Sequence, residues 1–105
     1  MQASLIIPTL NRKELLLKAL ASLQGQSFSD FEILIIDQSD HPLLLDDLPQ
    51  MEQEIRLFYL QEKNLPQARN LGAQKAQGQE EAIGKNLDRP DFKQDWMHQR
   101  YSRLG

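Results

Sequence analysis

Short runs of consecutive apolar residues punctuate the first part of the chain. Leu5–Ile7 ends at Pro8, and Ile33–Ile36 ends at Asp37. A third strand is expected at Arg56–Leu60, where apolar and aromatic residues follow an arginine. Continuous runs, as opposed to alternating ones, are typical of strands that are covered on both faces, as in parallel sheets. The pattern therefore predicts an α/β fold built on a parallel sheet of three strands.

The stretch between the first two runs has the pattern of an amphipathic helix. Leu16, Leu20 and Leu23 repeat at helical spacing and mark one apolar face. Asn11 is the expected N-cap, and Glu14 follows three residues later as its capping-box partner. A helix of this length suits the crossover between two parallel strands, so we expect a βαβ unit here.

A second helix is expected to begin at Pro66, since proline suits the first helical turn, and to end at Gly78. The composition then changes. Residues 79–105 contain no further β-branched run, and we expect a helical or disordered tail there. The chain thus divides into a βαβ region, residues 1–78, and a divergent tail, residues 79–105.

Composition narrows the class of protein. With 105 residues, 40% hydrophobic and 26% charged, the chain is long enough for one globular domain. The net charge of −3 gives no basis for nucleic-acid binding, and no apolar segment approaches the roughly 20 residues of a membrane span. The absence of cysteine excludes disulfides and thiolate metal sites. Without a signal peptide, these features indicate a cytoplasmic location.

Candidate binding residues gather where parallel strands end, because ligands of such sheets bind beyond the carboxyl ends of the strands. Thr9–Asn11, Asp37–Asp40 and Gln61–Leu65 are expected at that edge. Helix N-termini there favour anions, and Arg69 adds a planar donor suited to phosphate oxygens. Asp37 can accept hydrogen bonds from a ribose diol or from the imide N–H of uracil. The arrangement predicts a site for a nucleoside diphosphate.

Each of these residues also has a purely structural interpretation. Asp37 can cap its own turn, and Arg69 can lie exposed on its helix in an ion pair with Glu62. Thr9 and Asn11 can serve only to cap or turn the chain. The sequence leaves both interpretations open.

Three motifs resemble one known family. Ser-Leu-Ile-Ile-Pro-Thr-Leu-Asn-Arg, from residue 4, is similar to the first strand and turn of family 2 glycosyltransferases, which have the GT-A fold. Ile-Leu-Ile-Ile-Asp-Gln-Ser-Asp, from residue 33, resembles the second strand of that family and its aspartate turn. Asn-Leu-Pro-Gln-Ala-Arg-Asn-Leu-Gly, from residue 64, resembles its Ala-Arg-Asn-x-Gly segment. The resemblance extends over residues 3–78.

The resemblance implies a Rossmann-like sheet and the transfer of a sugar from a nucleotide sugar, often a UDP-sugar, to an acceptor. Pro8 and Thr9 would line the base pocket, Asp37 would hold the uracil or ribose, and Arg69 would lie near the base or diphosphate. With Asn11, which belongs to the same edge, these are the candidate nucleotide-binding residues.

The same resemblance implies parts that the sequence does not display. The family has a fourth strand beside the first, ending in an Asp-x-Asp motif that holds a divalent ion, Mn²⁺ or Mg²⁺, on the donor diphosphate. No such motif follows Gly78, and the acceptor half with the catalytic base has no counterpart. We therefore expect a truncated, incomplete GT-A fold with no metal-binding or catalytic residue and no sugar transfer by this chain alone.

The alternative is a non-catalytic protein, either a nucleotide-binding remnant or a subunit that pairs with another chain. Without a fourth strand, the first strand would have an exposed apolar edge. Exposed edges of this kind invite pairing with a strand of another chain.

Overall fold

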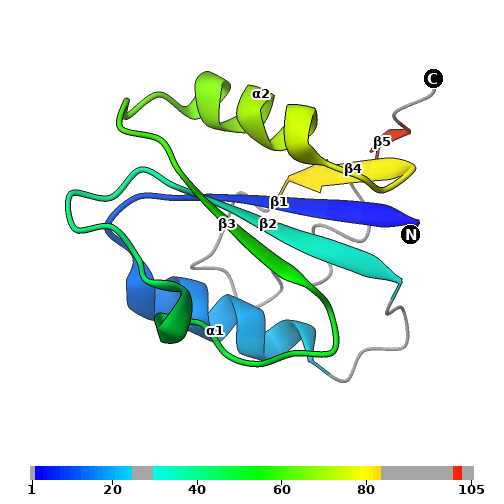
Figure 1. Cartoon of the computed structure of the whole chain (residues 1–105), viewed down its shortest axis with the longest axis horizontal. Coiled ribbons are helices and arrows are strands. Elements are labelled where there is room, and N and C mark those ends of the chain that lie inside the picture. Colours follow the sequence, from blue (N-terminus) through cyan, green and yellow to red (C-terminus); the bar gives the residue numbers. More distant parts are fainter. Residues whose placement is uncertain (1, 25–29, 84–100, 103–105) are drawn as a thin grey trace.

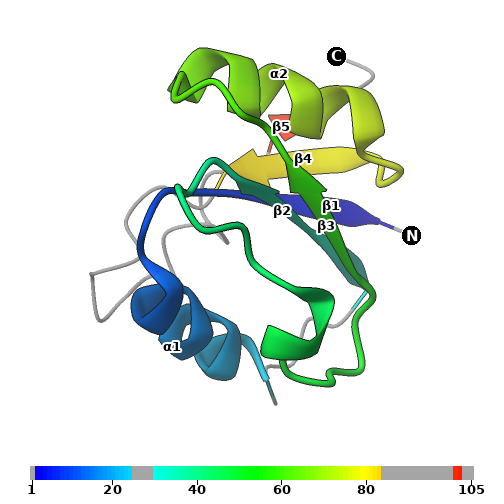
Figure 2. The ribbon, with the colours of Figure 1, turned by 60° about the vertical axis from the view of Figure 1, so that its left-hand side comes forward.

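The computed structural model describes residues 2–24, 30–83 and 101–102. Its elements in chain order are β1 (Ala3–Thr9), α1 (Lys13–Leu23), β2 (Phe31–Asp37), the short 3₁₀ helix η1 (Leu45–Asp47), β3 (Ile55–Tyr59), α2 (Leu65–Lys75), β4 (Glu80–Ile83) and β5 (Tyr101–Ser102). Figure 1 shows a three-layer arrangement in which α1 and α2 lie on opposite faces of one sheet, and the rotated view in Figure 2 agrees. Neither helix in the described ranges is long and apolar enough to cross a membrane.

The sheet has the strand order β3-β2-β1-β4-β5. β1 and β2 run parallel in register from Ala3 opposite Phe31 to Thr9 opposite Asp37. β3 is parallel to β2, with Tyr59 opposite Asp37. The carboxyl ends of three strands therefore meet at one edge of the sheet. The predicted α/β class, with three parallel strands and two main helices, is confirmed.

The two apolar layers explain why the strand sequences are continuously hydrophobic. Successive strand residues point to opposite faces, so Leu5, Ile7, Ile33 and Ile35 pack with the leucines of α1. The intervening residues pack under α2, and that cluster contains Ile6, Leu34, Ile36, Ala68 and Ala76. Each run thus supplies both layers, and every residue of β2 is buried.

A fourth parallel strand corrects the prediction that this strand is missing. β4 pairs with the free side of β1, from Glu80 opposite Ala3 to Ile83 opposite Ile6. The weak strand propensity of this segment predicts a tail, and pairing with a buried neighbour overrides that propensity. Since β4 covers the edge of β1, the argument for pairing with another chain through that edge fails. The remainder of the predicted tail, residues 84–100 and 103–105, lies outside the described residues.

The predicted capping box of α1 is also wrong. Arg12 is the N-cap and its side chain makes no capping bond, whereas Asn11 lies in the turn with φ of 55°. Asparagine tolerates this left-handed region better than most residues. In α2, by contrast, the Asn64 side chain accepts a hydrogen bond from the Gln67 backbone N–H at 3.2 Å. This helix ends at Lys75, before the predicted stop at Gly78.

Candidate functional site

A cleft of about 310 Å³ lies at the carboxyl end of β1. Its walls come from the turn after β1, the residue that follows β2, and the loop between β3 and α2. The lining residues are Pro8, Thr9, Leu10, Arg12, Gln38, Lys63 and Leu65. This is the edge at which the sequence predicts a ligand.

Two buried side-chain polar atoms of the described residues have no hydrogen-bond partner, one in the cleft lining and one, on Arg69, outside it. They are Thr9 Oγ1 and Arg69 Nε, and no other side-chain atom of the described residues shares this condition. Thr9 is 3% exposed. An unsatisfied buried donor or acceptor costs about 1–3 kcal/mol, so such atoms call for an explanation, and a ligand is one. The ion pairs of the described residues do not join Arg69 to Glu62.

Asp37 is the last residue of β2, directly before the cleft residue Gln38. Its side chain accepts hydrogen bonds from the Ser39 N–H on Oδ1 at 3.0 Å and from the Leu43 N–H on Oδ2 at 2.7 Å. The residue is 1% exposed and does not line the cleft. Its two oxygens hold the loop after β2 in its turn, as the structural interpretation of this residue requires.

Asn11 lies where the turn after β1 contacts the loop after β2. Its side-chain amide donates to Asp40 Oδ2 at 3.1 Å and accepts from the Asp40 N–H at 3.0 Å. Its own N–H donates to Ser39 Oγ at 2.7 Å. Asn11 lines a separate hollow, together with Lys13 and His41. The structure therefore brings Pro8 and Thr9 together in the cleft and leaves Asn11 outside it.

Gln38 is a cleft residue that the sequence analysis places at this edge, within Asp37–Asp40, without naming it as a candidate binding residue. It is 4% exposed, and its backbone N–H donates to the Thr9 carbonyl at 2.8 Å. Its side-chain Nε2 donates to the carbonyls of Glu62 at 2.7 Å and Asn64 at 3.0 Å. Its position directly after a strand-end Asp was a usable signal. The return of the loop before α2 to this point was not readable from the sequence.

Two cations give the cleft its charge. Arg12 and Lys63 line it, and none of the described residues in its lining is acidic. Lys63 also forms an ion pair with Asp40 at 2.6 Å and donates to the Gln38 carbonyl at 3.2 Å. Its hydrogen bond holds the pKa of the Asp40 carboxyl below the ordinary value of 3.8, and Asn11 adds to this effect. A cleft whose described lining contains two cations and no acidic residue favours an anionic ligand.

The described residues do not fit the divalent metal that the resemblance implies. Nowhere among them do three or more His, Cys, Asp or Glu side chains gather as a metal group. Asp40 is paired with Lys63, and Asp47 is paired with Lys13 at 3.0 Å. We therefore assign no metal ligand and derive no step through a metal.

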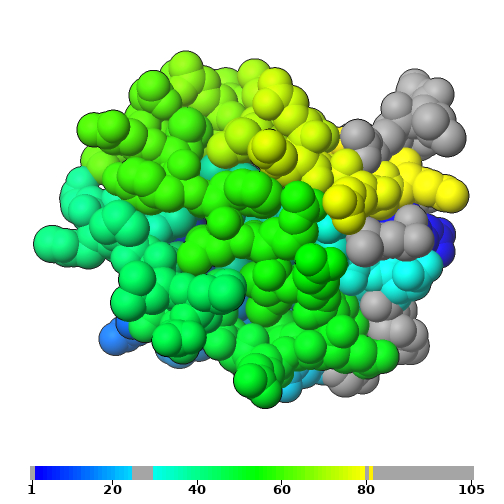
Figure 3. Space-filling model, viewed as in Figure 1, coloured from blue at the N-terminus to red at the C-terminus, as the bar shows by residue number. Residues whose placement is uncertain are grey.

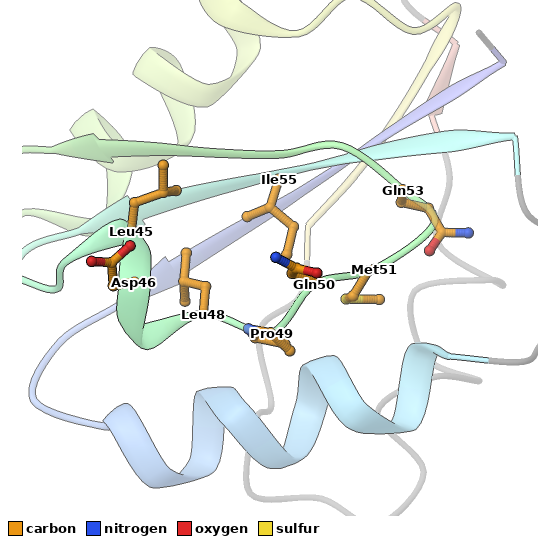
Figure 4. A pocket seen from close by; sticks show the side chains of 8 residues that line it. All are labelled: Leu45, Asp46, Leu48, Pro49, Gln50, Met51, Gln53 and Ile55. Atoms are coloured by element: carbon orange, nitrogen blue, oxygen red, sulfur yellow. The ribbon is translucent and has the colours of Figure 1, made fainter.

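A larger hollow of about 540 Å³ lies away from this edge. Figure 4 shows its lining, which comes from η1, the segment after it and Ile55 at the start of β3. In Figure 3 the green part of the chain, which includes β3 and the segment before it, covers the centre of the visible face. The lining mixes apolar side chains with the polar Asp46, Gln50 and Gln53 and contains none of the candidate binding residues. Among the described residues of this lining none is basic, so the hollow does not share the preference of the cleft for an anionic ligand.

Comparisons with known proteins agree with this arrangement. A glucosyltransferase of Campylobacter jejuni, GalNAc(5)-diNAcBac-PP-undecaprenol beta-1,3-glucosyltransferase, is 38% identical over 58 residues, which are 52% of this chain and 19% of that protein. The crystal structure of S. aureus TarS 1–349 superposes with a TM-score of 0.65 at 23% identity, which shows the shared fold. The complex of TarS 1–349 with UDP gives a TM-score of 0.59 at 25% identity.

The chain spans only part of these relatives. Each TarS 1–349 alignment covers 79% of this chain and 26% of that structure. The family model described as glycosyl transferase family 2 matches residues 4–84, well over half of the chain. The match runs through β1, β2, β3 and the fourth strand β4. The chain therefore belongs to glycosyl transferase family 2.

Proposed function

We propose that the cleft at the carboxyl end of β1 binds a nucleotide-sugar donor, and that the donor is a UDP-sugar. The observation that carries this proposal is the buried, unpartnered Oγ1 of Thr9, which lines the cleft; Arg69 Nε is a second unpartnered atom, but Arg69 is not part of the lining. Both belong to residues that the sequence singles out for nucleotide binding. The TarS 1–349 structure in complex with UDP supports the choice of nucleotide.

The roles follow from the positions of the side chains. Pro8 and Thr9 form the wall of the cleft, and the Thr9 hydroxyl binds the base or ribose. The cations of Arg12 and Lys63 lie on the lining, where they oppose the charge of the diphosphate. Asp37 acts indirectly: both of its carboxylate oxygens accept hydrogen bonds from the loop after β2 and hold that loop in place.

The wider reaction is transfer of the sugar from the donor to an acceptor hydroxyl, as is expected for a glycosyltransferase. This chain spans 26% of the TarS 1–349 structure, and its described residues provide donor binding without an assigned base. We infer that it contributes the donor site and transfers no sugar by itself. The cytoplasmic location expected from the sequence stays a prediction.

Calorimetric titration with UDP tests the proposal. Thr9→Val removes the hydroxyl but retains the branched shape, and we expect UDP affinity to fall about tenfold, the effect of one lost hydrogen bond. Ser22→Ala is the matched control, because the Ser22 hydroxyl bonds only the Ala19 carbonyl of its own helix at 2.6 Å. Absence of UDP binding to the folded wild-type chain would overturn the proposal.

A further inference from the structure

The outer side of β3 has no sheet partner among the described residues. β3 pairs with β2 and stands at the end of the strand order. The Leu60 N–H donates to the Asp37 carbonyl of β2 at 2.9 Å, and backbone groups alternate in direction along a strand. The N–H and C=O groups of Ile55, Leu57 and Tyr59 therefore face away from β2. They form a template on which another strand can pair.

β3 lacks the features that usually protect such an edge. Proteins blunt exposed edges with outward charges, prolines or bulges, whereas β3 reads Ile-Arg-Leu-Phe-Tyr. Its one charged residue, Arg56, is directed into the sheet, where it donates to Glu32 Oε1 at 3.3 Å and to the Lys75 carbonyl at 2.9 Å. Tyr59 ends the strand with 48% of its surface exposed. The outer side of β3 thus carries no charge that would repel a second strand.

The sequence of β3 is complementary to itself when two copies run antiparallel. With Leu57 opposite its own copy, Ile55 lies opposite Tyr59. These residues all face outward, so each pair can exchange both backbone hydrogen bonds. On the other face of the sheet Arg56 lies opposite Phe58. Arg56 is already 5.3 Å from the ring centroid of Phe58 in its own chain, and the second copy offers a further cation–π contact of the same kind.

Charge and strand length select this register over its neighbours. Moving the twofold axis from Leu57 to Arg56 would set two arginines directly opposite each other, and like charges in that position destabilise a sheet. Moving the axis to Phe58 would place Ile55 opposite Gln61, beyond the end of the strand. The register centred on Leu57 uses the whole strand and opposes no like charges.

The large hollow beside β3 offers space for a side chain of the second copy. Opposite residues of an antiparallel pair share one face of the sheet, so Tyr59 of one copy lies next to Ile55 of the other. Figure 4 shows Ile55 and Leu45 on the walls of this hollow of about 540 Å³, and Leu45 is 63% exposed. The Tyr59 hydroxyl has only a long hydrogen bond to the Ser39 carbonyl, at 3.4 Å. A tyrosine ring in the hollow removes exposed apolar surface from water.

We propose that two copies of this chain associate through their β3 strands, antiparallel and centred on Leu57, with Tyr59 of each copy packed into the hollow of the other. Such an interface is isologous, because the same surface serves both partners. Neither β3 nor the hollow belongs to the lining of the cleft, so this association is independent of the proposed function.

Sedimentation equilibrium of the purified chain tests the association. The wild-type chain is expected to form a reversible dimer with a dissociation constant below about 1 mM. Tyr59→Lys places a charge against the apolar wall of the hollow, and we expect it to weaken the dimer at least about tenfold. Leu44→Lys is the matched control, because Leu44 is an exposed apolar residue outside the lining of the hollow. It keeps the wild-type dissociation constant.

Cysteine crosslinking tests the register by a separate route. The chain contains no cysteine, so a single introduced thiol can pair only with its own copy. Leu57→Cys lies on the twofold axis, where the Cα atoms of a hydrogen-bonded pair are about 5.5 Å apart, a distance that a disulfide spans. Glu54→Cys is the control, because its two copies lie six residues apart along the ladder, about 20 Å. Oxidised glutathione is expected to crosslink Leu57→Cys alone, as a dimer band on a non-reducing gel.

The other outcomes overturn the proposed association. A wild-type chain that stays monomeric up to about 1 mM would leave the edge of β3 to a partner of different sequence. A dimer that Tyr59→Lys does not weaken, or that Leu44→Lys weakens equally, would place the contact on another surface. Equal crosslinking of Glu54→Cys and Leu57→Cys would exclude the register. Where Leu57→Cys does not fold, the sedimentation measurements decide alone.

Discussion

Each end of β1 buries one hydroxyl group, but only the hydroxyl at the amino end has hydrogen-bond partners among the described residues. Ser4, at the amino end, donates to Glu32 Oε2 at 2.6 Å and accepts from the Gly78 N–H at 2.8 Å. Thr9, at the carboxyl end, has a buried Oγ1 without any partner among the described residues. Both residues are at most 3% exposed. The two hydroxyl groups are buried to nearly the same depth, so burial does not explain the difference. The amino end uses its hydroxyl to hold the fold together, and the carboxyl end is the one at which we propose that a ligand binds.

The amino end is organised around Glu32, which is fully buried in β2. Besides Ser4, its carboxylate accepts from the Gln77 N–H at 2.6 Å and from Arg56 Nη1 at 3.3 Å. Arg56 also donates to the Lys75 carbonyl at 2.9 Å. We call these contacts the Glu32 network. It ties β1, β2 and β3 to the end of α2 and so fixes where the chain enters β4.

Removing the centre of the Glu32 network is expected to have the largest effect on stability. Glu32→Ala leaves a buried hydroxyl, a backbone N–H and the partly buried Arg56 without their acceptor, and we expect a loss of about 3 kcal/mol in the free energy of unfolding. Urea denaturation measures it, with Glu54→Ala, an exposed residue just before β3, as the control. Equal stability of the two variants would show that the network does not hold the fold.

A matched pair of hydroxyl deletions tests the comparison directly. Ser4→Ala leaves Glu32 and the Gly78 N–H short of a partner, so we expect it to lose about 1–2 kcal/mol of unfolding free energy. Thr9→Val removes a hydroxyl that satisfies nothing in the described structure, and its stability should stay equal or rise. Denaturation of both variants under the same conditions is sufficient. A loss in Thr9→Val as large as that in Ser4→Ala would break the contrast between the two ends of the strand.

The sequence predicts the open end of β1 better than the closed one. Thr9 follows a proline at the end of an apolar run, and parallel strands place their ligands at that edge. Glu32 gives no comparable signal, because a charged residue at the start of a strand usually lies exposed. Its partners come from an arginine in another strand and from the backbone after α2. Such a network exists only once the sheet has assembled.

The same reasoning explains the other differences between sequence and structure. The Glu80–Ile83 segment is a strand because β1 offers it a partner, a tertiary effect that local propensity does not show. Asn11 has the residue type of an N-cap, but its amide pairs with Asp40 instead. Asp37 lies at the end of its strand, as the sequence predicts, whereas its two loop contacts depend on how the following six residues turn. Contacts between segments distant in sequence decide the first two cases, and the path of a short loop decides the third.

The smallest effect is expected from the exposed charges at the carboxyl end. Lys63 and Asn11 lower the pKa of Asp40 in the folded chain below 3.8. A carboxyl whose folded pKa is depressed stabilises the fold above its unfolded pKa, and this contribution disappears as the pH falls through the folded pKa. Asp40→Asn should therefore melt slightly below the wild-type chain from pH 7 to 5, and the gap should close below about pH 4. The effect is small because exposed pairs are screened by solvent.

Thermal melting of the two proteins across this pH range measures the gap, and Asp46→Asn is the control, since none of the ion pairs of the described residues includes Asp46. A gap that stays constant down to pH 3 would contradict the assignment to the Asp40 charge. A gap as large as the loss in Ser4→Ala would contradict the contrast itself, because it would mean that the carboxyl end also carries the fold. A small gap that closes in acid, together with tighter UDP binding at low salt, would show that the charges of this end act on the ligand more than on stability.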